Sequence, residues 1–256
     1  VLYDSFPAPR ASGALQTGWG YAALVERGGQ RILFDTGGDG AVLARNAQTL
    51  GIKLGGLDAV VLSHRHPDHI GGLAAVVRVN PGVKIYIPRE AYGAFGVSPW
   101  NDLVMALSGV PRLRLEKVPE LPVADYVHVE NGTGIAAGVR VIATNSTYEH
   151  LELRELSLAV AIPGGQAVVV GCAHTGIGAV LNAAGGNVRW VAGGLHLMDA
   201  TPAEVADTVE VLRTKFRVER VAPGHCTGLR ATTALQRSFR ERSTPAGVGG
   251  VIVIGN

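Results

Sequence analysis

Apolar residues along this chain come in short runs that are rich in β-branched side chains and bounded by glycine or proline. Runs that are apolar at successive positions, not at alternate ones, are typical of strands in a sheet buried on both faces. The predicted strands are Tyr21–Glu26, Arg31–Phe34, Ala59–Leu62, Val83–Ile87, Val139–Ala143, Ser157–Ile162, Ala167–Val170, Val188–Ala192, Arg220–Ala222 and Val251–Ile254.

Helices are indicated by capping residues between these runs. Asp39 predicts the N-terminus of a helix that Gly51 would end. The segment Thr201–Glu204 combines an N-cap threonine, a proline at the first helical position and a capping-box glutamate. The apolar residues after it share one helical face: Val205, Val209 and Leu212. Because strands and helices alternate without a linker, we predict one α/β domain over residues 1–256.

Composition and charge narrow the functional classes. A hydrophobic content of 47% with 17% charged residues is typical of a globular protein. The net charge of +2 gives no electrostatic case for nucleic acid or an anionic membrane as partner, which leaves a small molecule. No apolar run approaches the length of a membrane span, and the start at Val1–Tyr3 resembles the middle of a strand. We therefore expect a soluble protein, cytoplasmic, or periplasmic or secreted if a leader was removed; its oligomeric state is open.

Glycines mark two kinds of turn. Those of the first kind follow predicted strands and adjoin histidine or cysteine: Gly71–Gly72, Gly171, Gly193–Gly194 and Gly224. Glycine permits backbone angles and close approaches that other residues resist, so we expect these loops to converge at one edge of the sheets. Gly28–Gly29 and Gly132–Gly134 indicate ordinary hairpin turns.

The segment His64–His69 carries the clearest chemical signal. Its sequence, His-Arg-His-Pro-Asp-His, places three of the eight histidines and a carboxylate directly after a predicted strand. Imidazole and carboxylate are ligands that zinc favours. His64 and His66 can reach one ion together, while Asp68 and His69 suit a second ion beside it. The segment therefore predicts a metal site, with two ions as its expected content.

Further ligands must come from later in the chain. His225 follows an abrupt Pro-Gly turn, and a ligand role is favoured over a capping or core role. Cys172 and His174 stand where the strand over 167–170 ends, and at least one of them should contact metal. Cys172 either binds or bridges the ions or is an inert buried thiol.

The remaining candidates have supporting or uncertain roles. His196 is expected to line the pocket as a proton donor or a substrate contact, so it and Asp68 are our candidate catalytic residues. Asp35 can orient a metal-binding imidazole through a hydrogen bond, cap its loop as an Asx turn, or do both. His150 is either a ligand or an exposed side chain, and His128 should point to solvent from a strand.

Substrate choice is expected to depend on the irregular segment over 88–122, which is interpreted as a lid or, equally well, as an ordinary surface insertion. Its aromatic residues Tyr92, Phe95 and Trp100 are candidate substrate contacts, and Trp19 could join the same wall. An apolar wall with a few cations suits a ring-bearing or anionic ligand.

These motifs resemble those of the metallo-β-lactamase superfamily. Its His-x-His-x-Asp-His signature stands here at His64–His69, preceded by the Asp-Thr-Gly of Asp35–Gly37. The segments Gly171–Ile177, Gly193–Leu197 and Pro223–Gly228 are similar to motifs of a narrower group, named 7,8-dihydropterin-6-methyl-4-(β-D-ribofuranosyl)aminobenzene 5'-phosphate synthases. The resemblance implies an αβ/βα four-layer sandwich: two mixed sheets face to face, helices outside, and metals at one edge.

The resemblance also implies a ligand assignment. His64, His66 and one later histidine would hold the first ion, and Asp68, His69 and His225 the second. In one departure from hydrolytic members, Cys172 fills the position of their bridging aspartate. The missing imidazole would then come from His150 or His174.

Two reactions are compatible with the predicted metal site and the resemblance. The leading hypothesis is a hydrolase with two divalent ions, most simply zinc, that uses a metal-bound hydroxide on an ester, lactone, amide or phosphoester. Iron, manganese or nickel would fit the same donors. The alternative is a transferase that joins a dihydropterin pyrophosphate to an aryl ribotide, as in the synthesis of methanopterin-type cofactors.

Overall fold

The computed structural model describes residues 1–9, 11–89, 121–148 and 151–254. Its strands form a five-stranded sheet in the order β1-β2-β3-β4-β5 and a six-stranded sheet in the order β11-β10-β9-β8-β7-β6. The first sheet contains β1 (Ala23–Arg27), β2 (Gln30–Phe34), β3 (Ala59–Val61), β4 (Lys84–Pro88) and β5 (Asp125–Val129). The second contains β6 (Thr133–Ala136), β7 (Val139–Tyr148), β8 (Leu151–Ile162), β9 (Gly165–Val170), β10 (Val188–Gly193) and β11 (Arg220–Pro223).

Both sheets are mixed. In the first, β1 pairs antiparallel with β2, and the other neighbours are parallel. In the second, β9, β10 and β11 are parallel, whereas β6, β7, β8 and β9 follow one another as an antiparallel meander. The parallel strands matter for function, because their carboxyl ends meet at the same edge of a sheet.

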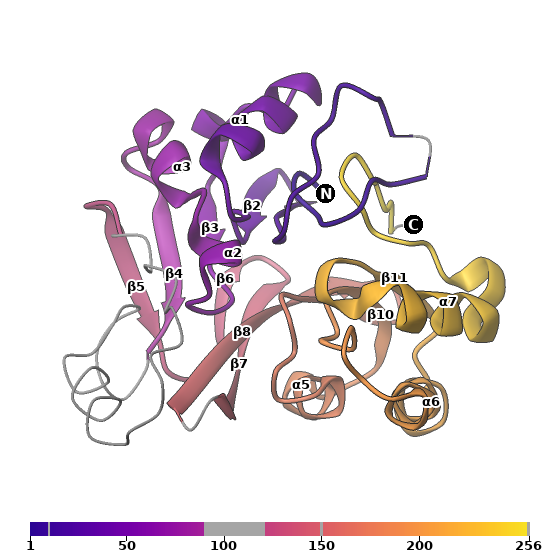
Figure 1. The fold of residues 1–256 in the computed structure, drawn as a ribbon. Helices are drawn as coiled ribbons and strands as arrows, with labels where there is room; N and C mark the ends of the chain where they lie inside the picture. The colour runs from indigo at the N-terminus through magenta and orange to yellow at the C-terminus, as the bar shows by residue number, and fades with distance from the viewer. Residues whose placement is uncertain (10, 90–120, 149–150, 255–256) are drawn as a thin grey trace, which may run out of the picture.

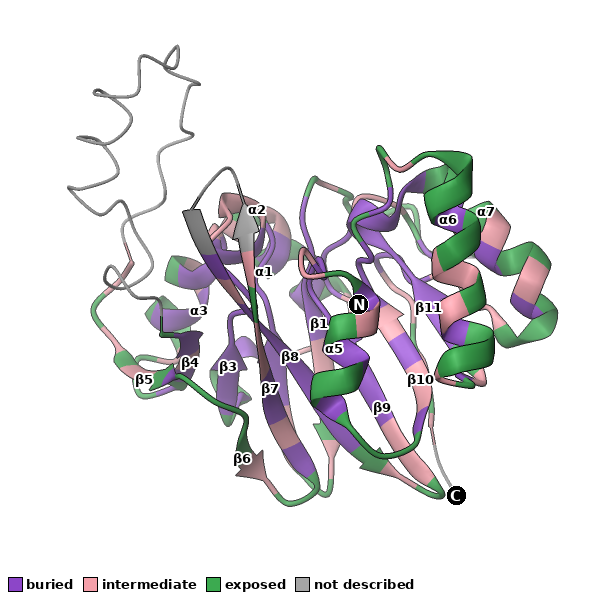
Figure 2. Cartoon of the chain, turned by 90° about the horizontal axis from the view of Figure 1, so that it is seen from below, coloured by how far each residue is buried: buried purple, intermediate pink, exposed green. Residues whose placement is uncertain are grey.

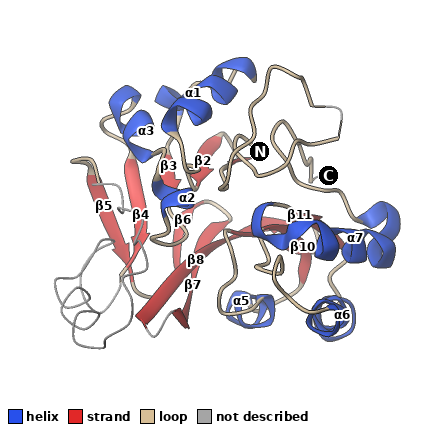
Figure 3. Ribbon diagram, viewed as in Figure 1, coloured by secondary structure: helices blue, strands red, loops and turns tan. Residues whose placement is uncertain are grey.

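Helices cover the outer faces of the two sheets (Figures 1 and 3). Those of the first sheet are α1 (Gly40–Thr49) and α3 (Leu73–Val79); those of the second are α5 (Ile177–Ala184), α6 (Pro202–Glu210) and α7 (Gly228–Phe239). Short helices are η1 (Leu54–Gly56), α2 (Pro67–Ile70), η2 (Val211–Lys215), η3 (His225–Thr227) and η4 (Arg240–Arg242). The predicted αβ/βα sandwich is confirmed.

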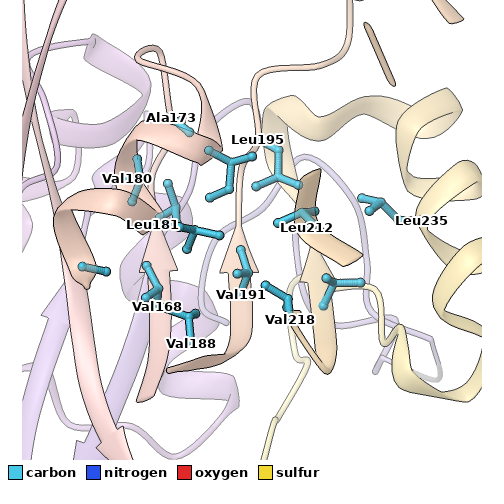
Figure 4. Packing of buried hydrophobic residues seen from close by; sticks show 14 of the residues in the cluster. Val168, Ala173, Val180, Leu181, Val188, Val191, Leu195, Leu212, Val218 and Leu235 are labelled. Atoms are coloured by element: carbon cyan, nitrogen blue, oxygen red, sulfur yellow. The ribbon is translucent and has the colours of Figure 1, made fainter. Parts of the chain in front are cut away.

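Three apolar clusters hold these layers together. Phe34 and Val61 of the first sheet pack against Leu156 and Leu158 of the second, so the sheets meet face to face. Alternate side chains of the same strands, such as Leu33, point outward to α1 and α3. The third cluster joins the second sheet to α5, α6 and α7, and the strands are mostly buried along their centres (Figures 2 and 4).

Most predicted elements are present, with local corrections at the edges. The segment Val251–Ile254 is not a strand: Val251 and Val253 are 80% and 85% exposed and pair with no neighbour among the described residues. The turn predicted at Gly132–Gly134 is wrong, because Thr133–Ala136 forms β6 and the hairpin turn follows at residues 137 and 138. The sequence placed His128 on a strand but gave no bounds for it; the structure shows this strand as β5, at the edge of the first sheet.

The predicted caps and the first hairpin turn are confirmed. Asp39 Oδ1 accepts hydrogen bonds from the backbone N–H groups of Ala41 and Val42, at 2.7 and 3.1 Å. The capping box at Thr201–Glu204 is formed. Gly28–Gly29 has φ angles of 57° and 80°, which a tight hairpin turn between β1 and β2 requires.

Some predictions fall on parts of the chain that the structure does not describe. The lid over 88–122 coincides almost wholly with residues 90–120, so Tyr92, Phe95 and Trp100 lie outside the described residues. His150 does as well. Within the described ranges, no helix has the length and apolar content that crossing a bilayer requires.

Candidate metal centre

The candidate ligands gather where strands of both sheets end. His64–His69 follows β3 of the first sheet. Cys172–His174, His196 and His225 follow the parallel strands β9, β10 and β11 of the second. Because all three of these strands point the same way, their loops reach the edge at which the β3 loop also lies. The glycine-marked loops thus converge, as the sequence indicated.

A first set of donor atoms comes from His64, Cys172 and His174, which lie within 4.8 Å of one another. His66 lies beside this set. Its Nδ1 is 2.9 Å from His64 Nε2, and its ring centroid is 4.9 Å from that of His174. Three imidazoles and a thiol therefore surround one position.

A second set comes from His69, Cys172 and His225, again within 4.8 Å. The Cys172 Sγ is 3.2 Å from His69 Nε2. Asp68 completes this group, since its Oδ2 is 3.6 Å from His69 Nε2 and 3.3 Å from His225 Nε2. Cys172 belongs to both sets and so lies between the two positions.

The chemistry of these donors fits divalent metal ions. Neutral imidazole, carboxylate and thiolate are ligands that zinc accepts, and histidine must be deprotonated to bind. Burial lowers the pKa of His64 well below its usual value, that of His66 to about 4 and that of His174 to about 2. The buried Nε2 of His225 makes no hydrogen bond of acceptable geometry among the described residues. The lowered pKa values favour neutral imidazoles, the form in which histidine can bind a metal ion.

Asp68 and His69, in contrast, favour their charged forms. Burial opposes ionisation of Asp68, but the neighbouring His69 and His225 outweigh it and hold the Asp68 pKa below its usual range. Burial likewise opposes protonation of His69, but Asp35 and Asp68 raise its pKa to about 9. A cation between these groups would therefore replace a proton on His69 as the partner of Asp68.

Asp35 lies directly behind His69. Its Oδ2 is 2.7 Å from His69 Nδ1 and accepts a hydrogen bond from Ser63 Oγ at 2.8 Å, while its Oδ1 accepts one from Ser63 N at 2.6 Å. This leaves His69 Nε2 directed at Cys172. The contacts fit the predicted role of a carboxylate that orients a metal-binding imidazole.

The backbone is unusual at the same residues. Among the described residues, six that are not glycine have a positive φ, and four of them lie here: Asp35, Ala173, His196 and His225. Their φ angles are between 46° and 60°. Non-glycine residues in this conformation are strained and concentrate at functional sites, where the surrounding contacts enforce them.

Two supporting groups at the N-terminus were missed by sequence reasoning. Asp4 Oδ1 accepts a hydrogen bond from His225 N at 3.1 Å, and Ser5 Oγ lies 3.2 Å from His225 Nδ1. The sequence carries no signal for these contacts, which join opposite ends of the chain. Trp19, 51% exposed, has its ring centroid 4.8 Å from that of His225.

Glu155 on β8 was also missed. It is 2% exposed, its Oε2 accepts a hydrogen bond from Thr175 N at 3.3 Å, and its Oε1 lies 4.0 Å from His64 Nδ1. Burial raises its pKa to about 7. The sequence carries no clear signal for it, because β8 also carries Glu152, Arg154 and Ser157.

The other histidines take different places. The His196 side chain is exposed, and its ring centroid is 4.1 Å from that of His174, so it borders the centre. His128 lies on β5 with an exposed side chain, as predicted.

Comparison with known proteins identifies relatives of this chain and supports its fold. The sequence profile of the metallo-β-lactamase superfamily matches residues 18–225. The 7,8-dihydropterin-6-methyl-4-(β-D-ribofuranosyl)-aminobenzene-5'-phosphate synthase of Methanocaldococcus jannaschii is 26% identical over 88% of this chain and 86% of its own length.

Solved structures show the same fold. Tm1679, described as a metal-dependent hydrolase of the β-lactamase superfamily, superposes with a TM-score of 0.74 at 24% identity, over 100% of this chain and 98% of that chain. The short form of human tRNase Z gives a TM-score of 0.55 at 17% identity, with 98% of each chain covered. At these identities the likeness concerns the fold alone.

Proposed function

Because the chain belongs to the metallo-β-lactamase superfamily, we propose that it is a metal-dependent hydrolase of a small-molecule ester, lactone, amide or phosphoester. The proposal includes two divalent ions, with zinc as the ion that these donors favour. The observation that carries the two-ion proposal is the position of Cys172, whose Sγ belongs to both imidazole sets.

The ligand assignment follows the two sets. His64, His66 and His174 would hold one ion. Asp68, His69 and His225 would hold the other, with Cys172 shared between them. In this proposal His174 supplies the imidazole that the sequence left open, because it lies within 4.8 Å of His64 and Cys172.

The residues around the centre then have distinct tasks. Two divalent ions would activate a water molecule and polarise the scissile carbonyl or phosphoryl group. Asp68, kept ionised by its two histidine neighbours, can accept a hydrogen bond from that water. His196 borders the centre with an exposed ring, where it can give a proton to the leaving group.

The test combines metal analysis with a substrate panel. Purified protein should contain two ions per chain by elemental analysis, and chelation followed by addition of zinc should remove and restore hydrolysis. Iron, manganese and nickel should be tried in parallel, because they accept the same donors. The proposal fails if metal-replete protein hydrolyses no ester, lactone, amide or phosphoester of a broad panel.

A second candidate rests on the synthase from M. jannaschii, which is similar over most of both chains. It is a transferase that joins a dihydropterin pyrophosphate to an aryl ribotide, with the metals binding the pyrophosphate. Incubation with both substrates distinguishes the two candidates. Release of pyrophosphate only when the aryl ribotide is present would favour the transferase, whereas turnover of single substrates with water favours the hydrolase.

A further inference from the structure

A third set of donor atoms lies at the rim of the metal centre. Cys172, His196 and Cys226 each present one such atom, and these lie within 4.8 Å of one another. The two thiols are almost fully buried, at 4% and 2% exposed, while the His196 side chain is exposed. Neither Cys226 nor His196 belongs to the two imidazole sets. The roles assigned above therefore leave Cys226 without a task.

The separation of the two sulfurs is suited to chelation. Cys226 Sγ lies 3.3 Å from Cys172 Sγ. Two thiolates that bind one tetrahedral zinc ion at about 2.3 Å have their sulfurs about 3.7 Å apart. A disulfide needs about 2.05 Å. A small increase in the distance between the two sulfurs would thus let both bind one ion, whereas a disulfide would require a larger decrease in that distance.

The backbone holds the three residues together. Leu197 N and Met198 N both donate to Cys226 O, at 3.0 and 3.1 Å, and His196 N donates to Cys226 Sγ at 3.3 Å. These bonds hold the loop after β10 against η3. They also maintain the positive φ of His196, at 50°. The imidazole is therefore fixed beside the thiol pair by the fold.

The donor types of this set differ from those of the imidazole sets. Two sulfurs and one nitrogen favour soft, thiophilic ions such as Cu⁺ and Cd²⁺, and they also accept Zn²⁺. We propose that Cys172, His196 and Cys226 form a thiolate-rich position for a soft cation, which competes with the imidazole positions for Cys172. The inhibition that this competition implies rests on the proposed function, but the binding of the ion does not.

Cadmium titration of the full-length, metal-free, reduced protein tests the binding. Cadmium–thiolate bonds absorb in the ultraviolet, so absorption per ion reports how many sulfurs bind. For the wild type we expect absorption typical of two thiolates. Cys226→Ser should halve the absorption of the first ion and weaken its binding more than about tenfold. Equal absorption and affinity in Cys226→Ser and wild type would overturn the proposal.

Two further variants distinguish cadmium binding at the thiolate-rich position from binding at the imidazole positions. His196→Ala changes an exposed side chain, so the fold should be kept; it should weaken cadmium binding while absorption per ion stays at the wild-type level. His66→Ala removes an imidazole outside the thiolate set and should leave both values unchanged. The proposal is also overturned if His66→Ala reduces the thiolate absorption as much as Cys226→Ser does.

The inhibition is measured separately, so that the two proposals fail independently. Cadmium added to active zinc-loaded enzyme should inhibit the wild type at a concentration at least about tenfold lower than Cys226→Ser. Equal inhibition of both would refute the competition. If the protein hydrolyses nothing, the proposed function fails, yet the absorption titration still decides whether the thiolate-rich position exists.

Discussion

The two sheets supply their halves of the metal centre in different ways. The first sheet contributes His64–His69, in which all the donors lie within six residues of one chain segment. The second sheet contributes Cys172, His174, His196 and His225, which come from three separate loops. The first half depends on local chain geometry, and the second on the parallel pairing of β9, β10 and β11.

The halves also differ in how their side chains are oriented. In the first, Asp35 and Ser63 form short hydrogen bonds behind His69. In the second, contacts between loops, such as Met198 N to Cys226 O, fix the backbone. A direct link joins the two, since Leu156 N on β8 donates to Ser63 O at 2.7 Å. We call the contact region between the halves, around Ser63, the junction. Substitutions in the first half should change metal affinity, whereas substitutions at the junction should also lower the stability of the fold.

The largest effect is expected for His69→Ala in the first half. His69 contacts both Asp35 and Cys172, so its loss would remove a proposed ligand and one of the contacts of Cys172 with the first sheet. We expect kcat/KM to fall at least about 100-fold, with loss of one ion per chain by elemental analysis. The matched control is His128→Ala, an exposed histidine on β5, which should retain both values. Retention of two ions and full activity by His69→Ala would contradict the assignment.

Asp35→Asn should have the second-largest effect. The amide keeps the shape of the side chain but loses the charge that favours the bond to His69 Nδ1. Loss of such an orienting carboxylate lowers metal affinity by about 10–100-fold. Competition with a chelator measures this for the zinc-loaded protein. An unchanged affinity would mean that Asp35 serves only to cap its loop through Ser63.

Gly171→Ala tests the junction between the halves. A Cβ at this glycine would lie 3.0 Å from Asp35 Oδ2 and press against the Ser63 side chain. Such overpacking should lower the free energy of unfolding by about 1–3 kcal/mol, measured by denaturant titration of the metal-free protein. Gly134→Ala on β6 is the control, because its Cβ would meet nothing within 4 Å. Equal stability of the two variants would show that the junction is not tightly packed.

The smallest effect is expected for Glu155→Gln in the second sheet. Its Oε1 is 4.0 Å from His64 Nδ1, compared with 2.7 Å for the pair Asp35 and His69. We therefore expect a loss of metal affinity of about tenfold or less, at the lower limit for residues that support ligands. Chelator competition on the same scale as for Asp35→Asn provides the comparison. A loss as large as that of Asp35→Asn would show that both halves depend equally on a buried carboxylate.

Elements with strong local signals were predictable from the sequence. Asp39 and Thr201 satisfy backbone N–H groups within their own helices, so their effect does not depend on the rest of the fold. The short edge strand β6 was missed, and β5 was indicated only through His128, because edge strands need only partly apolar faces. Val251–Ile254 failed for the opposite reason: its apolar residues find no strand to pair with.

The candidate site also contains residues with local sequence signals and residues that only the tertiary structure brings together. The histidines of His64–His69 could be predicted from spacing alone to lie close together, because one short loop holds them. Glu155 and Asp4 could not, since they approach the centre from distant parts of the chain. For Cys172 the sequence left open a ligand or an inert thiol, and only its neighbours distinguish these roles.

The sequence by itself determined the metal-binding motif, the superfamily and the alternation of strands and helices, because each is encoded in residues close along the chain. Tertiary structure decided that Cys172 lies between two sets of imidazoles, that His174 lies near His64, and that Cys226 approaches within 3.3 Å of Cys172. These contacts exist only after two sheets pack face to face and parallel strands align their ends. No local pattern specifies that packing.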